Sequence, residues 1–549
     1  MSKHRKHTGV ASIMIAMAML ALPAMGATIW NGNGDSNNDG NWNTNGNWDT
    51  GTQPSGESAT LGDVTGNGNS GDATRTVTLN TSESISQLIM TQSTGGYTNL
   101  LDMTGGTLTV SSSTPISQTL SGGSLQIDMS GSAHIRNSSG NSWTNDGTLN
   151  LAGSNVRIGA TGRSRNTTIT NAGSMDVGGT FATLGHQDTS TSSWPNGDIA
   201  LNNEASASIT VADGASLRLR SLSRFKGMGQ GNVYNKENST FQIGTEGGAG
   251  GSVRFWHYHN TAMNDDDYTS TQRFRNAGTL DVLGNSTLEL YEEWHGWHSS
   301  YPHAGTTQIF TVDNESTGTI NLNGTSTIGR LGAGTDGDKY LVTQFTNAGT
   351  FNKTGTGTAS ILSRESVTHF HGTFSYGSNT NTGTLNVQDA SGTLRFSQPL
   401  DSSGALIGNG TFAVDNGNIT IQDGGTVNAG QTPGDIATLG LEAATVVFED
   451  NSTLEIDVGS SDLIEITGDL ELDEGSIVEF TDTPASYGFS FLTYTGTLSG
   501  EFGSVLGLPD NMSVDYGTAG ILTVIPEPAS LALLALGSAV MVNMRRRRA

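Results

Sequence analysis

The sequence contains no cysteine and few charged residues. Of its 549 residues, 14% are charged, and 25 Lys and Arg stand against 51 Asp and Glu, which gives a formal net charge of −26. The absence of cysteine excludes a disulfide scaffold, thiolate metal sites and a cysteine nucleophile. The acidic balance argues against nucleic acid as a partner, because such a surface repels phosphate.

Helical spacing of apolar residues is missing from the middle of the chain, and long apolar runs occur only near its two ends. Glycine is abundant instead, with 75 residues, and short segments of alternating apolar and polar residues lie between Gly, Asn and Ser. These features are typical of many short strands joined by tight turns. The sequence therefore predicts an all-β fold.

One short unit recurs along the chain. It is Asn276-Ala277-Gly278-Thr279-Leu280-Asp281-Val282, and further copies begin at Asn145, Asn171, Asn347 and Asn381. Because Asn and Gly tolerate positive φ, Asn-x-Gly is interpreted as a tight turn. The triplet that follows should place Leu280 and Val282 on one face of a strand and Asp281 on the other.

Strands recur about every ten residues, so three would form a coil of roughly 25 to 35 residues. This pattern favours a right-handed parallel β-helix, with solenoid repeats over residues 64–444 and an acidic solenoid and cap over 445–524. In the acidic part, Asp457 and Asp462 are expected to face water. A string of Ig-like sandwiches is the alternative, which the short strands and the uniform turns disfavour.

Residues 1–26 have the features of a secretory signal peptide and predict processing by signal peptidase. A basic start precedes an apolar core from Val10 to Leu22, and small residues follow around Gly26 and Ala27. The apolar core is shorter than the ~20 residues that a spanning helix needs, which disfavours an uncleaved anchor.

Residues 27–63 form an Asn-, Gly- and Trp-rich segment that we interpret as an N-terminal cap, with Trp42 and Trp48 exposed or half-buried. Within it, Asp35, Asn37 and Asp39 match the first half of a calcium-binding loop. The twelfth position, where a bidentate acid belongs, is Gly46. A plain Asn/Gly loop is therefore the alternative to a Ca²⁺ site, and no other cofactor is indicated.

Residues 251–303 form an insertion rich in aromatic residues and histidine. The candidate glycan-binding residues there are Trp256, His257, His259, Glu293, Trp294, His295, Trp297 and His298. Rings beside carboxylates can form a sugar platform. His257 and His259 share one face of a strand and could hold zinc or copper if a third ligand converges, and paired carboxylates could cleave a glycoside. The plainer alternative is that the cluster only packs over an open flank of the solenoid.

The stretch from Leu217 to Lys226 is the only basic cluster inside the exported part of the chain. It has two interpretations. The arginines could lie on a strand face and pair with acidic neighbours, or they could form a binding patch for an anionic glycan.

The C-terminal segment, residues 525–549, has three parts in a fixed order. Pro526-Glu527-Pro528 is followed by an apolar run from Ala529 to Met544 and by the arginines Arg545, Arg546, Arg547 and Arg548. This order resembles the PEP-CTERM sorting signal of Gram-negative bacteria. The resemblance implies that an exosortase recognises Pro526, Glu527 and Pro528 and removes the tail, after a short hydrophobic anchor helix has held the chain in the inner membrane with its arginine stop in the cytoplasm. It also implies a cell-surface or extracellular-matrix location and association with exopolysaccharide in a biofilm.

The body resembles the autotransporter-type β-strand repeat proteins that often carry this tail, through Gly46-Asn47-Trp48, the Asn-x-Gly-Thr-Leu units and residues 425–479. We therefore expect a structural or adhesive protein without enzymatic activity, since no nucleophile elbow or convincing catalytic grouping is present. The alternative is a secreted β-helix enzyme that binds or degrades polysaccharide.

Overall fold

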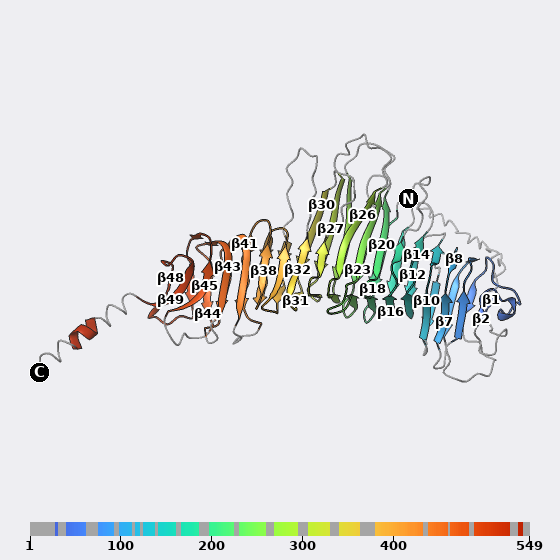
Figure 1. The fold of residues 1–549 in the computed structure, drawn as a ribbon, viewed down its shortest axis with the longest axis horizontal. Coiled ribbons are helices and arrows are strands. Elements are labelled where there is room, and N and C mark those ends of the chain that lie inside the picture. The colour runs from blue at the N-terminus through green and yellow to red at the C-terminus, as the bar shows by residue number, and fades with distance from the viewer. Residues whose placement is uncertain are drawn as a thin grey trace, which may run out of the picture.

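The chain folds into a long stack of parallel β-strands, drawn in Figure 1. The computed structural model describes residues 28–30, 40–61, 75–92, 98–111, 116–120, 124–137, 141–160, 166–185, 197–223, 230–259, 268–294, 306–329, 340–362, 379–431, 437–458, 462–481, 488–527 and 536–541. Along most of the stack each strand pairs in parallel with the third strand after it. Three strands therefore make one coil, which confirms the predicted parallel β-helix and excludes the Ig-like alternative.

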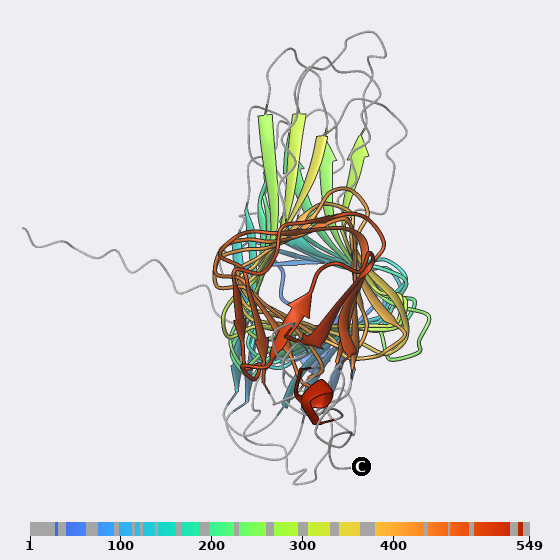
Figure 2. The same cartoon turned by 90° about the vertical axis from the view of Figure 1, so that its left-hand side faces the viewer.

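Each coil contributes one strand to each of three faces, and Figure 2 looks along the stack. Face 1 comprises β2 (Gly40–Asn41), β4 (Arg75–Leu79), β7 (Thr98–Met103), β10 (Ser124–Met129), β13 (Thr148–Leu151), β16 (Ser174–Val177), β19 (Ser208–Val211), β22 (Thr240–Ile243), β25 (Thr279–Val282), β28 (Thr319–Asn323), β31 (Thr350–Thr354), β34 (Thr384–Val387), β37 (Ala405–Gly408), β40 (Thr426–Ala429), β42 (Thr453–Ile456), β44 (Ile477–Phe480) and β47 (Ser504–Leu506).

Face 2 comprises β5 (Glu83–Ile85), β8 (Gly106–Val110), β11 (Ala133–Asn137), β14 (Val156–Ala160), β17 (Ala182–Gly185), β20 (Ser216–Ser223), β23 (Ser252–His259), β26 (Thr287–Trp294), β29 (Thr327–Gly329), β32 (Gly357–Leu362), β35 (Gly392–Phe396) and β38 (Thr411–Val414).

Face 3 begins with the four-stranded sheet β1 (Thr28–Ile29), β3 (Ala59–Leu61), β6 (Leu88–Gln92) and β9 (Ile116–Leu120). It continues with β12 (Asn141–Asn145), β15 (Thr167–Asn171), β18 (Ile199–Asn203), β21 (Gly231–Asn235), β24 (Tyr268–Asn276), β27 (Thr306–Asn314), β30 (Tyr340–Asn347), β33 (Asn379–Asn381), β36 (Leu400–Ser402) and β39 (Ile419–Ile421). The long strands β41 (Thr438–Phe448) and β43 (Leu463–Leu472) then serve faces 2 and 3 together, since β41 pairs with both β38 and β39.

The alternation read from the sequence sets which residues enter the core. On β25, Leu280 and Val282 are fully buried, whereas Asp281 points outward and accepts a hydrogen bond from the Asn321 side chain at 2.8 Å. Stacking repeats this arrangement along face 1, so the interior is one apolar column. It is interrupted on β31, where the fully buried Lys353 is aligned with Leu322 and Val387. Burial of this apolar area is the main driving force for folding.

A ladder of buried asparagines runs along the end of face 3. Its members each occupy the last position of their strand and are at most 1% exposed: Asn145, Asn171, Asn203, Asn235, Asn276, Asn314, Asn347 and Asn381. Each Nδ2 donates to the Oδ1 of the next asparagine at 2.7 or 2.8 Å. The ladder ends where Asn381 donates to the Ser402 hydroxyl at 2.9 Å. Each amide also donates to a backbone carbonyl at the start of the next coil's face-1 strand, as Asn276 does to Thr319 at 3.0 Å.

The Asn-x-Gly unit is therefore not the positive-φ turn that the sequence predicted. Its glycines, such as Gly173 and Gly278, do not have positive φ, and its asparagines are buried at strand ends. Glycine is required because the neighbouring coil lies too close for a side chain. A Cβ on Gly173 would lie 2.0 Å from the carbonyl oxygen of Gly147, and one on Gly278 would lie 2.4 Å from two carbonyl oxygens.

Coil length varies much more than the predicted 25 to 35 residues. Successive ladder residues are separated by 21 to 41 positions. The two longest steps, 41 and 38 residues, end at Asn276 and Asn314. There the strands themselves are lengthened, and β20, β23, β24, β26, β27 and β30 project beyond the body of the solenoid (Figures 1 and 2). We call this projection the ridge.

The N-terminal end of the stack is closed by three indoles. Trp30, Trp42 and Trp48 are 4%, 0% and 1% exposed, and they pack edge to face at ring separations of 4.9 and 5.1 Å around the short 3₁₀ helix η1 (Asn45–Asn47). Trp48 donates its Nε1–H to the carbonyl of Trp42 at 2.7 Å. The expectation that Trp42 and Trp48 are exposed or half-buried was wrong, because the first coil has no coil before it and its apolar interior must be covered.

The C-terminal end is closed by a change to antiparallel pairing. β45 (Phe489–Tyr494) and β48 (Met512–Asp515) both pair antiparallel with β49 (Ile521–Pro526), while β46 (Leu498–Ser499) continues the parallel stack. Just before this cap, Asp457 and Asp462 are 7% and 1% exposed, so the expectation that they face water was wrong. Asp462 accepts the backbone N–H groups of Asp457 and Ala437 at 3.0 and 3.3 Å.

We predict that Asn276→Ala destabilises the solenoid by about 3 kcal/mol. It removes the ladder acceptor of the Asn235 amide and the ladder donor of the Asn314 carbonyl, both of which are buried. Asn321→Ala, which removes a half-exposed amide from the outside of face 1, is the matched control and should cost about 1 kcal/mol or less. Urea unfolding measures both. Equal losses would show that the ladder contributes no more than a surface amide.

Gly173→Ala should also destabilise strongly, by more than about 2 kcal/mol, because the added Cβ meets backbone that cannot move without opening the stack. Gly178→Ala is the control in the same coil, since a Cβ there meets nothing within 4 Å and its φ is not positive. The two thermal unfolding midpoints should differ clearly, and similar midpoints would contradict the close-stacking explanation.

Candidate functional site

Five of the eight predicted glycan-binding residues lie on described strands of the ridge. Trp256, His257 and His259 lie on β23, and Glu293 and Trp294 lie on β26. His295, Trp297 and His298 lie outside the described residues, as do the calcium-loop candidates Asp35, Asn37 and Asp39. Among the residues that are described, no group of three or more His, Asp or Glu is arranged to hold a metal ion.

The two halves of the predicted site are neighbours in the fold. β23 and β26 pair in parallel, and their register sets His257 beside Glu292, Tyr258 beside Glu293, and His259 beside Trp294. One turn of the solenoid thus brings together segments that are far apart in the sequence. Of the positions that the sequence grouped by composition, those that the structure describes lie on these two adjacent strands.

Trp256 is half-buried on the outer side of face 2 and packs against two arginines. The Arg218 guanidinium carbon lies 4.8 Å from the centre of the Trp256 ring, and that of Arg220 lies 5.4 Å from it. Arg218 also lies 4.2 Å from the centre of the Phe181 ring. Aromatic faces attract cations, so these rings hold the guanidinium groups against the sheet surface.

These contacts belong to a column of side chains that crosses six coils of face 2. Successive partners in the parallel register are His134, Arg157, Thr183, Arg218, Arg254 and Glu289. Arg136 and Arg220 lie two residues further along β11 and β20, on the same side of their strands. We call Arg136, Arg157, Arg218, Arg220 and Arg254 the arginine stripe. The sequence indicated a basic strand at 217–226, but it gave no sign that Arg136 and Arg157 would extend it.

Two titratable groups, His134 and Glu289, lie at the two ends of the column and have shifted pKa values. Burial lowers the pKa of His134, and the neighbouring charges of Arg157 and Arg136 lower it further. The Arg136 Nε is buried and has no hydrogen-bond partner among the described residues. At the other end of the column, Glu289 forms an ion pair with Arg254. Burial raises the pKa of this carboxyl, an effect that Arg254 and Arg218 oppose.

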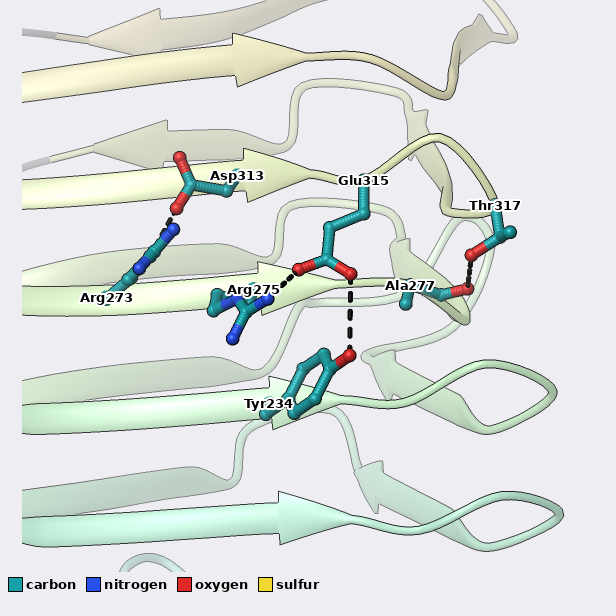
Figure 3. A network of polar contacts seen from close by, with 7 residues as sticks. All are labelled: Tyr234, Arg273, Arg275, Ala277, Asp313, Glu315 and Thr317. Atoms are coloured by element: carbon teal, nitrogen blue, oxygen red, sulfur yellow. Dashed lines mark hydrogen bonds and ion pairs between the residues drawn. The ribbon is translucent and has the colours of Figure 1, made fainter.

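On face 3, two arginines pair with carboxylates of the next coil, as Figure 3 shows. Arg273 pairs with Asp313 on the neighbouring strand β27, and Arg275 pairs with Glu315, the first residue after that strand. Tyr234 lies under Arg275, with 4.5 Å between ring centre and guanidinium carbon, and donates to Glu315 at 3.4 Å. Each of these two arginines therefore meets a carboxylate one coil away, and their charge is balanced within the face.

The sorting segment emerges directly from the C-terminal cap. Pro526 is the last residue of β49 and is opposite Met512 in the antiparallel register, and the Glu527 N–H donates to the Asn511 carbonyl at 2.9 Å. Pro528 and the arginines from Arg545 to Arg548 lie outside the described residues. Residues 536–541 form a short helix whose Leu536 and Met541 are 63% and 71% exposed. None of the helices that the structure describes has the length and apolar character needed to cross a membrane.

Comparison with protein families identifies this segment. Residues 524–548 match the PEP-CTERM protein-sorting motif, which confirms the resemblance found in the sequence. The motif marks an exported protein that an exosortase processes. No curated protein matches the chain. The resemblance of the body to autotransporter-type repeats stays a prediction.

The attachment of Pro526 and Glu527 to the cap leads to a prediction about processing. Val514→Gly should loosen β48 and with it the edge that holds the motif, so the tail should be removed faster, by about threefold or more if release of this edge limits the reaction. Val505→Gly, on the exposed strand β47, is the control. Pulse-chase analysis of the full-length chain in an exosortase-containing host measures the rates. Unchanged processing would show that the motif is read before the cap forms.

Proposed function

We propose that this protein is a non-catalytic structural element of the cell surface or extracellular matrix, which holds exopolysaccharide through its ridge. The observation that carries the proposal is the ridge itself, where an exported solenoid lengthens the strands that bear Trp256 and the predicted glycan-binding residues. A sorting motif brings such a surface out of the cell.

The architecture suits a structural role. The in-register stack and its buried asparagines make a stiff rod whose neighbouring coils support one another. On this rod, β23 and β26 carry aromatic, histidine and carboxylate residues side by side at the far end of the ridge. Rings that stack on sugar faces beside carboxylates that accept hydroxyl groups are the elements of a carbohydrate site.

The proposal is tested by the retention of the full-length protein in matrix. The chain is expressed in an exosortase-containing host, and the fraction that sediments with the isolated exopolysaccharide is measured. Replacing Trp294 and Trp297 with alanine should lower the retained affinity about fivefold or more, because two stacking surfaces are lost. Tyr234→Ala, which removes an aromatic ring from face 3, is the control and should have little effect.

The same samples decide between a binding protein and an enzyme. Release of reducing ends is followed during the incubation, and none above the background is expected. Release that depends on the protein and disappears in Glu293→Gln would replace the structural proposal with the enzymatic one. Equal retention of the wild type and the double tryptophan variant would show that the ridge is not the binding site.

A further inference from the structure

We propose that the outward side of face 1, from β19 to β34, is an ice-binding surface. Two columns of polar side chains run along it, one of hydroxyl groups and one mostly of amides, and both repeat with the coils. We call this surface the ordered face. The inference goes beyond the proposed function, because the ligand is crystalline water and no residue of the ridge takes part.

The first column consists of hydroxyl groups. On each strand, the residue before the first buried apolar residue points outward, and the parallel register aligns these residues from coil to coil. Each member is half-exposed or exposed, and the column comprises Ser208, Thr240, Thr279, Thr319, Thr350 and Thr384. Stacked strands repeat every ~4.8 Å, so the hydroxyl groups repeat at that distance along the axis.

The second column lies two residues further along the same strands, about 6.8 Å away across the face. Amides predominate in it, and its members are Thr210, Gln242, Asp281, Asn321, Asn352 and Asn386. Hydrogen bonds between coils hold the amides in place, since Asn321 donates to Asp281 at 2.8 Å and Asn352 donates to Asn321 at 2.9 Å. Side chains that are fixed in advance lose little conformational freedom when a regular ligand binds.

One acceptor in this column points to water as the ligand. Asn386 is on the outward side of β34, between the fully buried Leu385 and Val387, and is itself 8% exposed. Its Oδ1 has no hydrogen-bond partner among the described residues. A buried acceptor of this kind is normally satisfied by an ordered water molecule. Water bound there can also bridge to the neighbouring hydroxyl and amide groups, which begins an ordered layer over the face.

The location of the ordered face keeps it regular and accessible. Its strands have four or five residues each, whereas β24 and β27 of face 3 have nine. The ridge rises from the corner between faces 2 and 3, and Figure 1 shows face-1 strands such as β16 and β31 on the opposite side of the stack. The additional length of the longest coils therefore does not cover the ordered face.

The chemistry of the two columns favours ice over other regular ligands. A crystalline polysaccharide offers sugar faces that stack on aromatic rings, and neither column contains a ring. A mineral or a row of divalent cations needs carboxylates. The chain has 51 Asp and Glu, yet Asp281 is the only charged member of the two columns, and it accepts the Asn321 amide. A neutral grid that repeats every ~4.8 Å along the axis and ~6.8 Å across it remains, and the water molecules of an ice surface repeat at similar distances in two perpendicular directions.

The experiment freezes a dilute solution of the full-length protein slowly and measures the fraction that enters the growing ice, from which ordinary solutes are excluded. The fraction should exceed that of ovalbumin by about tenfold or more. The double variant T319Y/T350Y should lower it about fivefold or more, because two rings in the middle of the array keep the ice surface at a distance. Tyrosine is favourable in strands, so the solenoid should still fold.

The matched control is T311Y/T346Y, which makes the same changes on face 3 of the same two coils. Thr311 is aligned with Arg273 and Thr346 with Asp313, so both side chains point outward there. Uptake of this variant into ice should stay within about twofold of the wild type, because the two sites are on different faces. Thermal unfolding checks that each variant is folded. If T319Y/T350Y does not fold, Thr350→Tyr alone, at an exposed position, should show a smaller loss in the same direction.

Three results would overturn the inference. Exclusion of the wild type from ice to the same extent as ovalbumin would show that the protein does not bind ice. Equal uptake of the wild type and T319Y/T350Y would show that ice binds elsewhere on the molecule. Sedimentation with microcrystalline cellulose that T319Y/T350Y loses, together with exclusion from ice, would show that the ordered face takes a polysaccharide crystal instead. Retention in matrix through Trp294 and Trp297 is measured separately, so the proposed function does not depend on any of these results.

Discussion

The buried amide ladder is the interaction on which the rest of this structure depends. Each asparagine donates to its counterpart in the next coil and to the strand that opens the following face-1 segment. A slip of one residue would bury an unpaired amide and turn every apolar side chain of the strand outward. The ladder thus fixes the register of all three faces together. Because the register is fixed, residues that are far apart in the sequence form straight columns on the outer surface.

These columns can place like charges next to one another, and the three faces differ in which groups surround the charged side chains. In-register stacking sets like residues beside one another, and like charges repel. On face 1, some outward carboxylates accept hydrogen bonds from amides one coil away, as where Asn150 donates to Asp128 at 2.6 Å and Asn321 donates to Asp281. On face 3, arginines meet acids one coil away. On face 2, Arg218 lies against the rings of Phe181 and Trp256, and Arg254 pairs with Glu289 on the neighbouring strand. The three faces therefore offer three different surfaces to the outside.

Much of the architecture could be predicted from the sequence because alternation of period two and the recurring unit are local signals. They gave the parallel β-helix and the inward Leu280 and Val282. What failed depended on the neighbouring coil. The glycines serve close approach rather than positive φ, the cap tryptophans are buried, and Asp462 binds backbone N–H groups. The arginine stripe was missed for the same reason. Arg136, Arg157 and Arg218 become neighbours only once coil lengths are known, and those lengths follow no fixed period.

Coil length ranges from 21 to 41 residues over one unbroken ladder. Two parts of the chain therefore tolerate change to different degrees. The strand ends and the glycines beside them cannot change without opening the stack. The strands of faces 2 and 3 can be lengthened at the corner between them, because β23, β24, β26 and β27 project outward and still pair in parallel with their neighbours. An insertion at a corner can therefore add a new surface feature without a change in the stacked coils that carry it. The ridge, where two successive coils have the longest ladder steps, is an example of such an insertion.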